Sequence, residues 1–282
     1  MSASHFILRG QRFDLDTPRV MGILNATPDS FHASSRVAGA SAAEDAVHMV
    51  QEGAAILDLG GQSSRPGAER VGPAEEWRRV KPALEAIRTA LPDVPISIDT
   101  FHADVARQAL DAGADMINDI SAGALDPELP LVVAEQRVPY AIMHMQGTPG
   151  TMQDNPVYRE VVHEVKHHLE ERCAQLKALG IEHLVVDPGF GFGKTIEHNY
   201  SLLQHLDVLS DIGCPILVGV SRKSMIHRVL ECTSEEALNG TTALHAWALD
   251  RGAHWLRVHD VAPAVECIRL HQYLRASERH HD

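Results

Sequence analysis

Eight short apolar runs, most of them ending in a polar residue, recur along the 282-residue chain and constrain its fold more than any other feature. They cover residues 20–25, 55–60, 96–99, 116–118, 140–144, 184–187, 216–219 and 255–258. Short apolar runs of this kind, bounded by turn-forming residues, are typical of buried β-strands. The sequence therefore predicts eight strands at a regular spacing.

Helical patterns fill the segments between these runs. Ser41 and Glu44 have the spacing of a capping box ahead of an apolar stripe, which predicts a helix that begins near Ser41. After Pro73, apolar residues recur every three or four positions, which predicts a second helix with a local kink at Pro82. Strands and helices therefore alternate along the chain.

Eight strand-and-helix pairs, after a short N-terminal segment that could form a hairpin, predict a single-domain (β/α)₈ TIM barrel over residues 1–282. An open doubly wound sheet is the alternative, but it would place a glycine-rich dinucleotide loop where this chain has 25-NATPDS-30. Functional residues of a barrel lie at the C-terminal ends of its strands. This rule selects Asn25, Asp99, Asn118 and Asp187 as candidate site residues.

Charge and composition exclude several classes of partner. The net charge is −13, which disfavours nucleic acid because phosphate backbones are held by basic surfaces. No apolar run approaches the roughly 20 residues that span a bilayer, so we expect no membrane role. The first residues lack the long apolar core of a secretory signal, and the four cysteines form no C-x-x-C pair, which predicts a cytoplasmic protein. His163 and His167 have a possible metal spacing, but a solvated helix face explains them better.

The loops after the first two predicted strands carry polar groups with two possible interpretations. Asn25 offers an amide oxygen that could bind a hard cation such as Mg²⁺, or it belongs to a turn together with Pro28 and Asp29. The segment 58-DLGGQSSRPG-67 places two hydroxyl groups and Arg65 beside a glycine pair. Such a segment suits an anion-binding loop or a flexible turn, and composition does not decide between them.

Asp99, Asn118 and Asp187 end the third, fourth and sixth predicted strands, and together they suit a heterocycle with adjacent N–H donors. Each alone could be a helix cap or a strand-end acceptor. In 187-DPGFGFGKT-195 three residues separate Gly189 from the glycine of the GK pair, whereas a nucleotide-binding P-loop needs four. The segment is therefore no P-loop, and its two phenylalanines serve either packing or a flat ligand.

The last two predicted strands lead into basic residues. Lys223 and Ser224 fall near the start of a helix, and strand alternation places Arg257 and His259 on one face. Barrels often bind phosphate at this position, so these residues predict a cationic corner. A surface salt bridge is the alternative interpretation of Arg257.

Eight motifs in order resemble the bacterial dihydropteroate synthase family. They are MGILNATPDSF, GGQSSRPGA, SIDTF, INDIS, MHMQGTP, DPGFGFGK, SRKSM and RVHD, and the resemblance covers about residues 21–265. It implies a transferase that joins a pterin diphosphate to 4-aminobenzoate in folate synthesis, by dissociative substitution. It also implies Mg²⁺ as cofactor, sulfonamides as inhibitors and a homodimer.

The resemblance also implies roles for individual residues. The pterin would be held by Asp99, Asn118, Asp187 and Lys223, with Met143 beneath it. Mg²⁺ would contact Asn25, and the diphosphate would contact Ser64, Arg257 and His259, with Arg65 at the same anion site. The 4-aminobenzoate pocket would contain Phe31, Pro66, Phe192, Lys223 and Ser224. Lys223, Asp99 and Arg65 are the expected catalytic residues.

Two departures from the family pattern and two rival functions remain. Ser64 stands where the family commonly has threonine, and Ala33, Ser34 and Ser35 replace Asp-Gly-Gly, which stiffens the first loop and affects its closure. A pterin-dependent methyltransferase on the same barrel is one rival, although it needs no diphosphate corner. An inactive pterin-binding paralogue is the other rival, and the altered first loop is its support.

Overall fold

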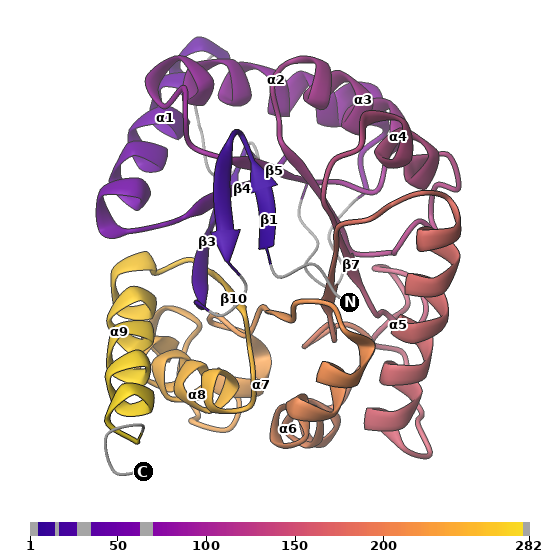
Figure 1. Cartoon of the computed structure of the whole chain (residues 1–282), viewed down its shortest axis with the longest axis vertical. Helices are drawn as coiled ribbons and strands as arrows, with labels where there is room; N and C mark the ends of the chain where they lie inside the picture. Colours follow the sequence, from indigo (N-terminus) through magenta and orange to yellow (C-terminus); the bar gives the residue numbers. More distant parts are fainter. Residues whose placement is uncertain (1–4, 15–16, 27–34, 63–69, 279–282) are drawn as a thin grey trace.

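Parallel strands pair side by side into a barrel in the computed structural model, which describes residues 5–14, 17–26, 35–62 and 70–278 (Figure 1). Within these residues the barrel strands are β3 (Arg19–Asn25), β4 (Ile56–Gly60), β5 (Ile96–Asp99), β6 (Met116–Asp119), β7 (Tyr140–Met143), β8 (Leu184–Asp187), β9 (Leu217–Val218) and β10 (Trp255–Val258). Their order is β8-β7-β6-β5-β4-β3-β10-β9, and a bridge between Val186 and Ile216 joins the two outer strands. The predicted barrel and its eight strands are confirmed.

Helices follow the strands and cover the outside of the barrel, as Figure 1 shows. They are α1 (Ser35–Glu52), α2 (Pro73–Ala90), α3 (Ala103–Asp111), α4 (Leu129–Gln136), α5 (Val161–Ala178), α6 (Ile196–Gln204), α7 (Ser224–His227), α8 (Leu238–Asp250) and α9 (Val261–Glu278). Two 3₁₀ helices, η1 (Leu206–Ile212) and η2 (Glu235–Ala237), lie among them. No described helix is both long enough and apolar enough to cross a membrane.

The main apolar core lies between the strands and the helices. Leu59, Ile98 and Ile117 of the sheet belong to it together with Val80 and Leu84 of α2. Because the strands are covered on both faces, they are apolar throughout, and this explains why they appear in the sequence as continuous apolar runs.

The helix α2 has the predicted position, whereas α1 differs from its prediction. Pro73 stands in the first turn of α2, where its missing N–H is not needed, and the helix continues through Pro82. The helix α1 begins at Ser35, so the prediction that Ser41 caps it is wrong. A Cβ atom on Gly39 would lie 2.9 Å from the Pro82 carbonyl oxygen, so the first turns of α1 pack closely on α2. This tertiary packing overrides the local capping signal.

The predicted N-terminal hairpin is present and closes one end of the barrel. Its antiparallel strands are β1 (His5–Leu8) and β2 (Gln11–Asp14). Phe6 and Phe13 lie with their ring centroids 6.1 Å and 6.2 Å from that of Trp255, the first residue of β10. Leu8 of the hairpin and six barrel-strand residues complete this buried cluster, namely Met21, Ile56, Met116, Ala141, Val185 and Leu217. These residues lie near the N-terminal ends of the strands, so the hairpin leaves the C-terminal ends for the site.

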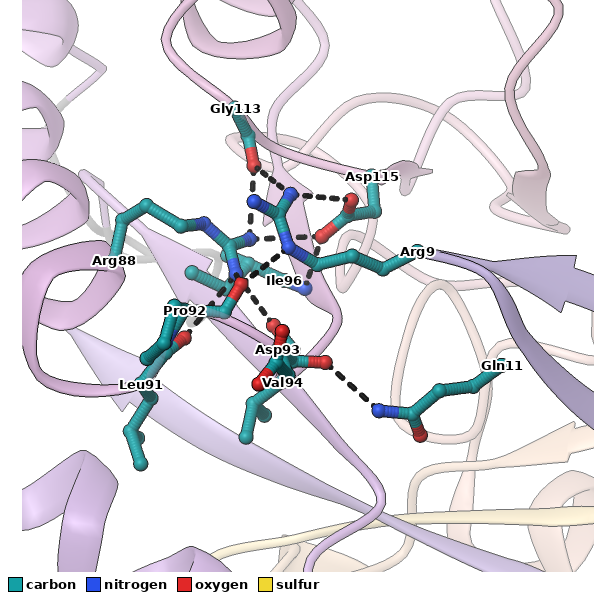
Figure 2. A network of polar contacts seen from close by, with 10 residues as sticks. All are labelled: Arg9, Gln11, Arg88, Leu91, Pro92, Asp93, Val94, Ile96, Gly113 and Asp115. Carbon is teal, nitrogen blue, oxygen red and sulfur yellow. Dashed lines mark hydrogen bonds and ion pairs between the residues drawn. The ribbon is translucent and has the colours of Figure 1, made fainter.

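Arg9 of the hairpin and Arg88 of α2 both bind the loops that precede β5 and β6, as Figure 2 shows. Arg9 Nη1 lies 3.1 Å from Asp115 Oδ1, and Arg88 Nη2 of α2 lies 2.8 Å from Asp115 Oδ2. Arg88 also donates to the carbonyl oxygens of Val94 at 2.7 Å and of Gly113 at 2.8 Å. A single carboxylate therefore connects the hairpin turn, α2 and the segment before β6.

Candidate active site

Predicted site residues lie side by side at the C-terminal ends of the strands. The strand register pairs Asn25 with Gly60, Gly60 with Asp99, and Asp99 with Asn118. On the neighbouring strands Met143 pairs with Asp187. The structure therefore brings the three predicted heterocycle-binding residues to one end of the barrel.

A buried charge network lies just below this level. Arg257 donates from Nε to Asp58 Oδ2 and from Nη2 to Asp99 Oδ2, both at 2.6 Å. Asn118 Nδ2 donates to the same Asp58 oxygen at 3.0 Å. Asp58 is fully buried, so the interpretation of Arg257 as part of a surface salt bridge is wrong. The network orients a guanidinium and an amide that the sequence assigns to substrate binding.

The electrostatics of this network follow from burial. Burial raises the pKa of Asp99, Arg257 opposes this effect, and the neighbouring Asp58 adds to it. Burial lowers the pKa of Arg257, but the two carboxylates outweigh burial and hold the pKa above its usual value. Arg257 therefore stays charged at physiological pH.

Asp58 is a site residue that the sequence reasoning missed. It stands inside the apolar strand β4, two residues before the end. A lone carboxylate inside an apolar run was the available signal, because a buried charge requires a partner. The partner, Arg257, is 199 residues away along the chain, and no local pattern connects them.

Asp187 and Lys223 meet beside Gly219, directly after β9. A Cβ atom on Gly219 would lie 3.7 Å from Lys223 Nζ, 3.8 Å from Asp187 Oδ2 and 4.0 Å from Arg257 Cβ. Both pKa values shift toward the neutral form. Burial lowers the pKa of Lys223 to about 8 although Asp187 opposes it, and burial raises the pKa of Asp187 although Lys223 opposes it. Two opposite charges therefore share one desolvated corner.

Lys223 has the predicted position ahead of a helix, since it directly precedes α7 and Ser224 is its first residue. Its ammonium group donates to the Phe190 carbonyl oxygen at 2.6 Å and lies 4.8 Å from the centroid of the Phe192 ring. Phe192 and Met143 belong to a buried apolar cluster with Phe101, Ile120 and Met152. Cationic and apolar surfaces therefore meet at this side of the barrel end.

His259 belongs to a second pairing between the last two barrel loops. Its Nδ1 lies 3.0 Å from Ser221 Oγ, and its backbone N–H donates to the same oxygen at 3.2 Å. The next residue, Asp260, forms an ion pair with Arg222 at 2.7 Å. The SRKSM and RVHD motifs are thus joined, and His259 lies at the end of β10 beyond Arg257.

The remaining predicted site residues are four loop residues and the expected Mg²⁺ ligand, Asn25. Phe31, Ser64, Arg65 and Pro66 lie outside the described residues. Asn25 is exposed at the end of β3. Among the described residues no group of three or more His, Cys, Asp and Glu side chains could hold a metal ion. One amide oxygen fits Mg²⁺ only together with substrate phosphates and water, which is the usual donor set of this ion.

Comparisons with known proteins agree with this geometry. A family model described as "Pterin binding enzyme" matches residues 21–259. The curated dihydropteroate synthase of Haemophilus influenzae is 44% identical over 262 residues, which cover 92% of this chain and 94% of that protein. That of Escherichia coli K12 is 44% identical over 269 residues, with 93% of each chain covered.

Solved structures give the same result. The Yersinia pestis dihydropteroate synthase with a sulfonamide drug complex has a TM-score of 0.90 at 39% identity, covering 96% of this chain and 99% of that one. The Xanthomonas albilineans dihydropteroate synthase with 4-aminobenzoic acid has a TM-score of 0.90 at 41% identity, covering 98% and 99%. The chain therefore belongs to the pterin-binding enzyme family, among its dihydropteroate synthases.

Proposed function

We propose that this chain condenses 6-hydroxymethyl-7,8-dihydropterin diphosphate with 4-aminobenzoate, releasing 7,8-dihydropteroate and diphosphate in folate biosynthesis. The supporting observation is the meeting of Asp187, Lys223 and Arg257 around Gly219 at the C-terminal end of the barrel. A pterin offers N–H donors to carboxylates, and its diphosphate needs fixed cations. The methyltransferase alternative has no use for these cations.

The pterin ring is assigned to the acidic side of the site. Asp99, Asn118 and Asp187 supply acceptors at strand ends, where the barrel backbone holds them in register. Lys223 adds a cation beside Asp187, and Met143 supplies an apolar surface below the ring. Rigid strand-end positions favour binding because little freedom is lost when the ligand arrives.

The diphosphate is assigned to the cationic side. Arg257 lies in β10 and His259 directly follows this strand, and Ser64 and Arg65 of the loop after β4 complete the anion site in this proposal. Mg²⁺, held by Asn25 and the substrate phosphates, would neutralise part of the leaving group's charge. Arg257 contributes the same kind of stabilisation from the protein, and its carboxylate partners keep it charged and oriented.

The arylamine is assigned to the pocket formed by Phe192, Lys223 and Ser224 together with Phe31 and Pro66. The carboxylate of 4-aminobenzoate would bind Lys223 and the first residue of α7, where a positive charge and backbone N–H groups occur together. Phe192 lies under the Lys223 ammonium group and offers its ring to the aromatic substrate. Lys223 therefore serves both substrates.

The reaction proceeds by dissociative substitution in this proposal. The C–O bond to the diphosphate breaks first, and its electron pair leaves with the diphosphate. Asp99 and Asp187 favour the positive charge that develops on the pterin. The amine nitrogen then forms the C–N bond with its lone pair and releases a proton to water. No protein nucleophile takes part, which is why Lys223, Asp99 and Arg65 act by binding and charge.

A second copy of the chain is the proposed partner. Leu270, Tyr273 and Leu274 share one face of α9 and are between 60% and 80% exposed, and Trp247 of the adjacent α8 is 60% exposed. An exposed apolar patch of this kind favours association. We also propose that the protein acts in the cytoplasm, because its four cysteines are scattered along the chain without a C-x-x-C pair.

Mixing the purified protein with both substrates and Mg²⁺ tests the function. Chromatography should show dihydropteroate and diphosphate only when all three components are present. Tight pterin binding without product would favour the inactive paralogue, and a lack of pterin binding would contradict the proposal. Light scattering at several concentrations, with Leu270→Glu for comparison, tests the dimer in the same preparation.

A further inference from the structure

The turn that follows β8 holds several of the groups assigned to the substrates. The N–H of Gly189 donates to Asp187 Oδ1 at 2.7 Å, and the Phe190 carbonyl oxygen accepts from Lys223 Nζ at 2.6 Å. The Phe192 ring lies 4.8 Å from the same ammonium group. The position of this turn, residues 189–193, therefore sets where the Lys223 ammonium lies.

A buried lysine at the end of this turn ties it to the segment after β7. Lys194 is 3% exposed, and its Nζ lies 2.9 Å from the Gly189 carbonyl oxygen and 3.0 Å from that of Phe192. It also lies 3.0 Å from His144 Nδ1 and 3.3 Å from the His144 carbonyl oxygen. An ammonium group has three protons, so these four acceptors use all of them.

Other contacts from the segment after β7 hold the same turn. Tyr158 donates from its hydroxyl group to the Gly193 carbonyl oxygen at 2.8 Å. Gln153 Nε2 donates to the Gly191 carbonyl oxygen at 2.6 Å. The turn is thus connected to this segment at both ends and in the middle, and Lys194 makes the most buried connection.

Burial shifts the pKa values of the groups in this cluster. Burial lowers the pKa of Lys194 to about 7, and Asp187 opposes this effect. Burial and the nearby Lys194 hold the pKa of His144 far below its usual value, so its imidazole is neutral and Nδ1 can accept from Lys194. The lysine is therefore bound by backbone carbonyls and a neutral ring, with no carboxylate in direct contact among the described residues.

We propose that Lys194 is a positioning residue for 4-aminobenzoate, because it fixes the turn that carries Phe192 and the acceptor of Lys223. The inference rests on the proposed function and on the assignment of Phe192 and Lys223 to the arylamine pocket. Lys194 is no catalytic residue, because its donors are all bound to protein atoms.

Replacing Lys194 by methionine, which has a similar length and no donors, tests the proposal. With saturating pterin diphosphate, the KM for 4-aminobenzoate should rise about 10- to 100-fold, since displacing a binding group by about 1 Å has effects of this size. The KM for the pterin diphosphate should rise less, because Lys223 is only one of its assigned contacts and strand register holds Asp99, Asn118 and Asp187. A role in folding alone would lower the active fraction and leave both KM values unchanged.

Two further variants make the result decisive. Tyr158→Phe removes one hydrogen bond to the same turn and should raise the same KM by about threefold. Lys166→Met, which removes an α5 lysine that pairs with Glu170 and Asp211, should change neither KM. If Lys194→Met folds and its KM for 4-aminobenzoate is unchanged, the inference is overturned. If Lys194→Met does not fold, an unchanged KM for 4-aminobenzoate in Tyr158→Phe overturns the inference instead. Absence of product with the unmodified protein would instead contradict the proposed function.

Discussion

Arg257 Nε lies 2.6 Å from Asp58 Oδ2, and this contact crosses the inside of the barrel from β10 to β4, past the intervening strand β3. The other end of the guanidinium reaches Asp99 of β5. One cation therefore connects three strands below the position assigned to the pterin. The two carboxylates hold Arg257 in place before the substrate arrives, which reduces the cost of ordering it during the reaction.

Asp58→Asn should weaken this arrangement while keeping the shape of the side chain. Arg257 would lose one of its two ionic partners, and the buried charge would be less well compensated. We expect a loss of about 1–3 kcal/mol in the free energy of unfolding and a rise of about tenfold in the KM for the pterin diphosphate. Denaturant unfolding and steady-state kinetics measure the two effects.

The control for this variant is Asp211→Asn, which removes the exposed partner of Lys166 on the outside of the barrel. Exposed ion pairs contribute little, so neither measurement should change for the control. If Asp58→Asn kept the KM of the unmodified protein, Arg257 would not depend on Asp58 for its position.

Lys223 should make the binding of 4-aminobenzoate depend on pH. Its pKa is lowered to about 8 by burial, so the ammonium group loses its proton as the pH rises through this value. The substrate carboxylate stays ionised throughout, and its attraction to Lys223 is therefore lost on the alkaline side. We expect kcat/KM for 4-aminobenzoate to be highest below about pH 8 and to fall above it, with a somewhat higher midpoint when bound diphosphate adds negative charge.

The comparison for this profile is Lys223→Gln, which has no titrating group at the same position. Its kcat/KM should be low and should show no fall centred near pH 8. A fall of the same size in both proteins would assign the alkaline limb to another group.

Arg88→Met should destabilise the fold and leave catalysis intact. The guanidinium binds Asp115 and four carbonyl oxygens at the closed end of the barrel (Figure 2). The candidate site lies at the opposite, C-terminal ends of the strands. Removing one partner of a mostly buried ion pair costs about 3–5 kcal/mol, and the remaining Arg9 should reduce this loss. Thermal unfolding should show a lower midpoint, whereas both KM values should stay unchanged.

Arg78→Met on the same helix is the matched control for this stability effect. Arg78 forms an exposed ion pair with Glu75 one turn away, so solvent screens it. The unfolding midpoint of this variant should equal that of the unmodified protein. A shift as large as that of Arg88→Met would mean that the loss of stability does not depend on the ion pair between Arg88 and Asp115.

The sequence predicts the strands and their terminal residues well for a physical reason. Parallel barrel strands are apolar on both faces, so Ile96–Asp99 and Leu184–Asp187 appear as distinct runs. Residues near their C-terminal ends lie at the site end of the barrel by topology alone, which is why Asp99, Asn118 and Asp187 could be chosen without knowing any contact. The hairpin and the helix after Pro73 follow from equally local signals.

What the sequence does not predict depends on contacts between distant segments. The start of α1 at Ser35 depends on the close approach of Gly39 to α2, and this contact is stronger than the capping signal at Ser41. The roles of Asp58 and Lys194 could not be predicted from the sequence, because their partners come from other strands and loops. Buried charges identify such residues only once the structure shows what surrounds them.

Gly189→Ala should displace the turn after β8 and thereby damage the site. The residue has φ +72°, and a Cβ atom there would clash with the His144 carbonyl oxygen, so the two loops must separate. Gly180→Ala is the matched control, since φ is +89° but no atom lies within 4 Å of its Cβ position. The control should lose about 1–2 kcal/mol of stability from backbone strain and keep both KM values. Gly189→Ala should lose more stability and bind 4-aminobenzoate at least about tenfold more weakly; equal kinetics in the two variants would show that the close approach has no functional consequence.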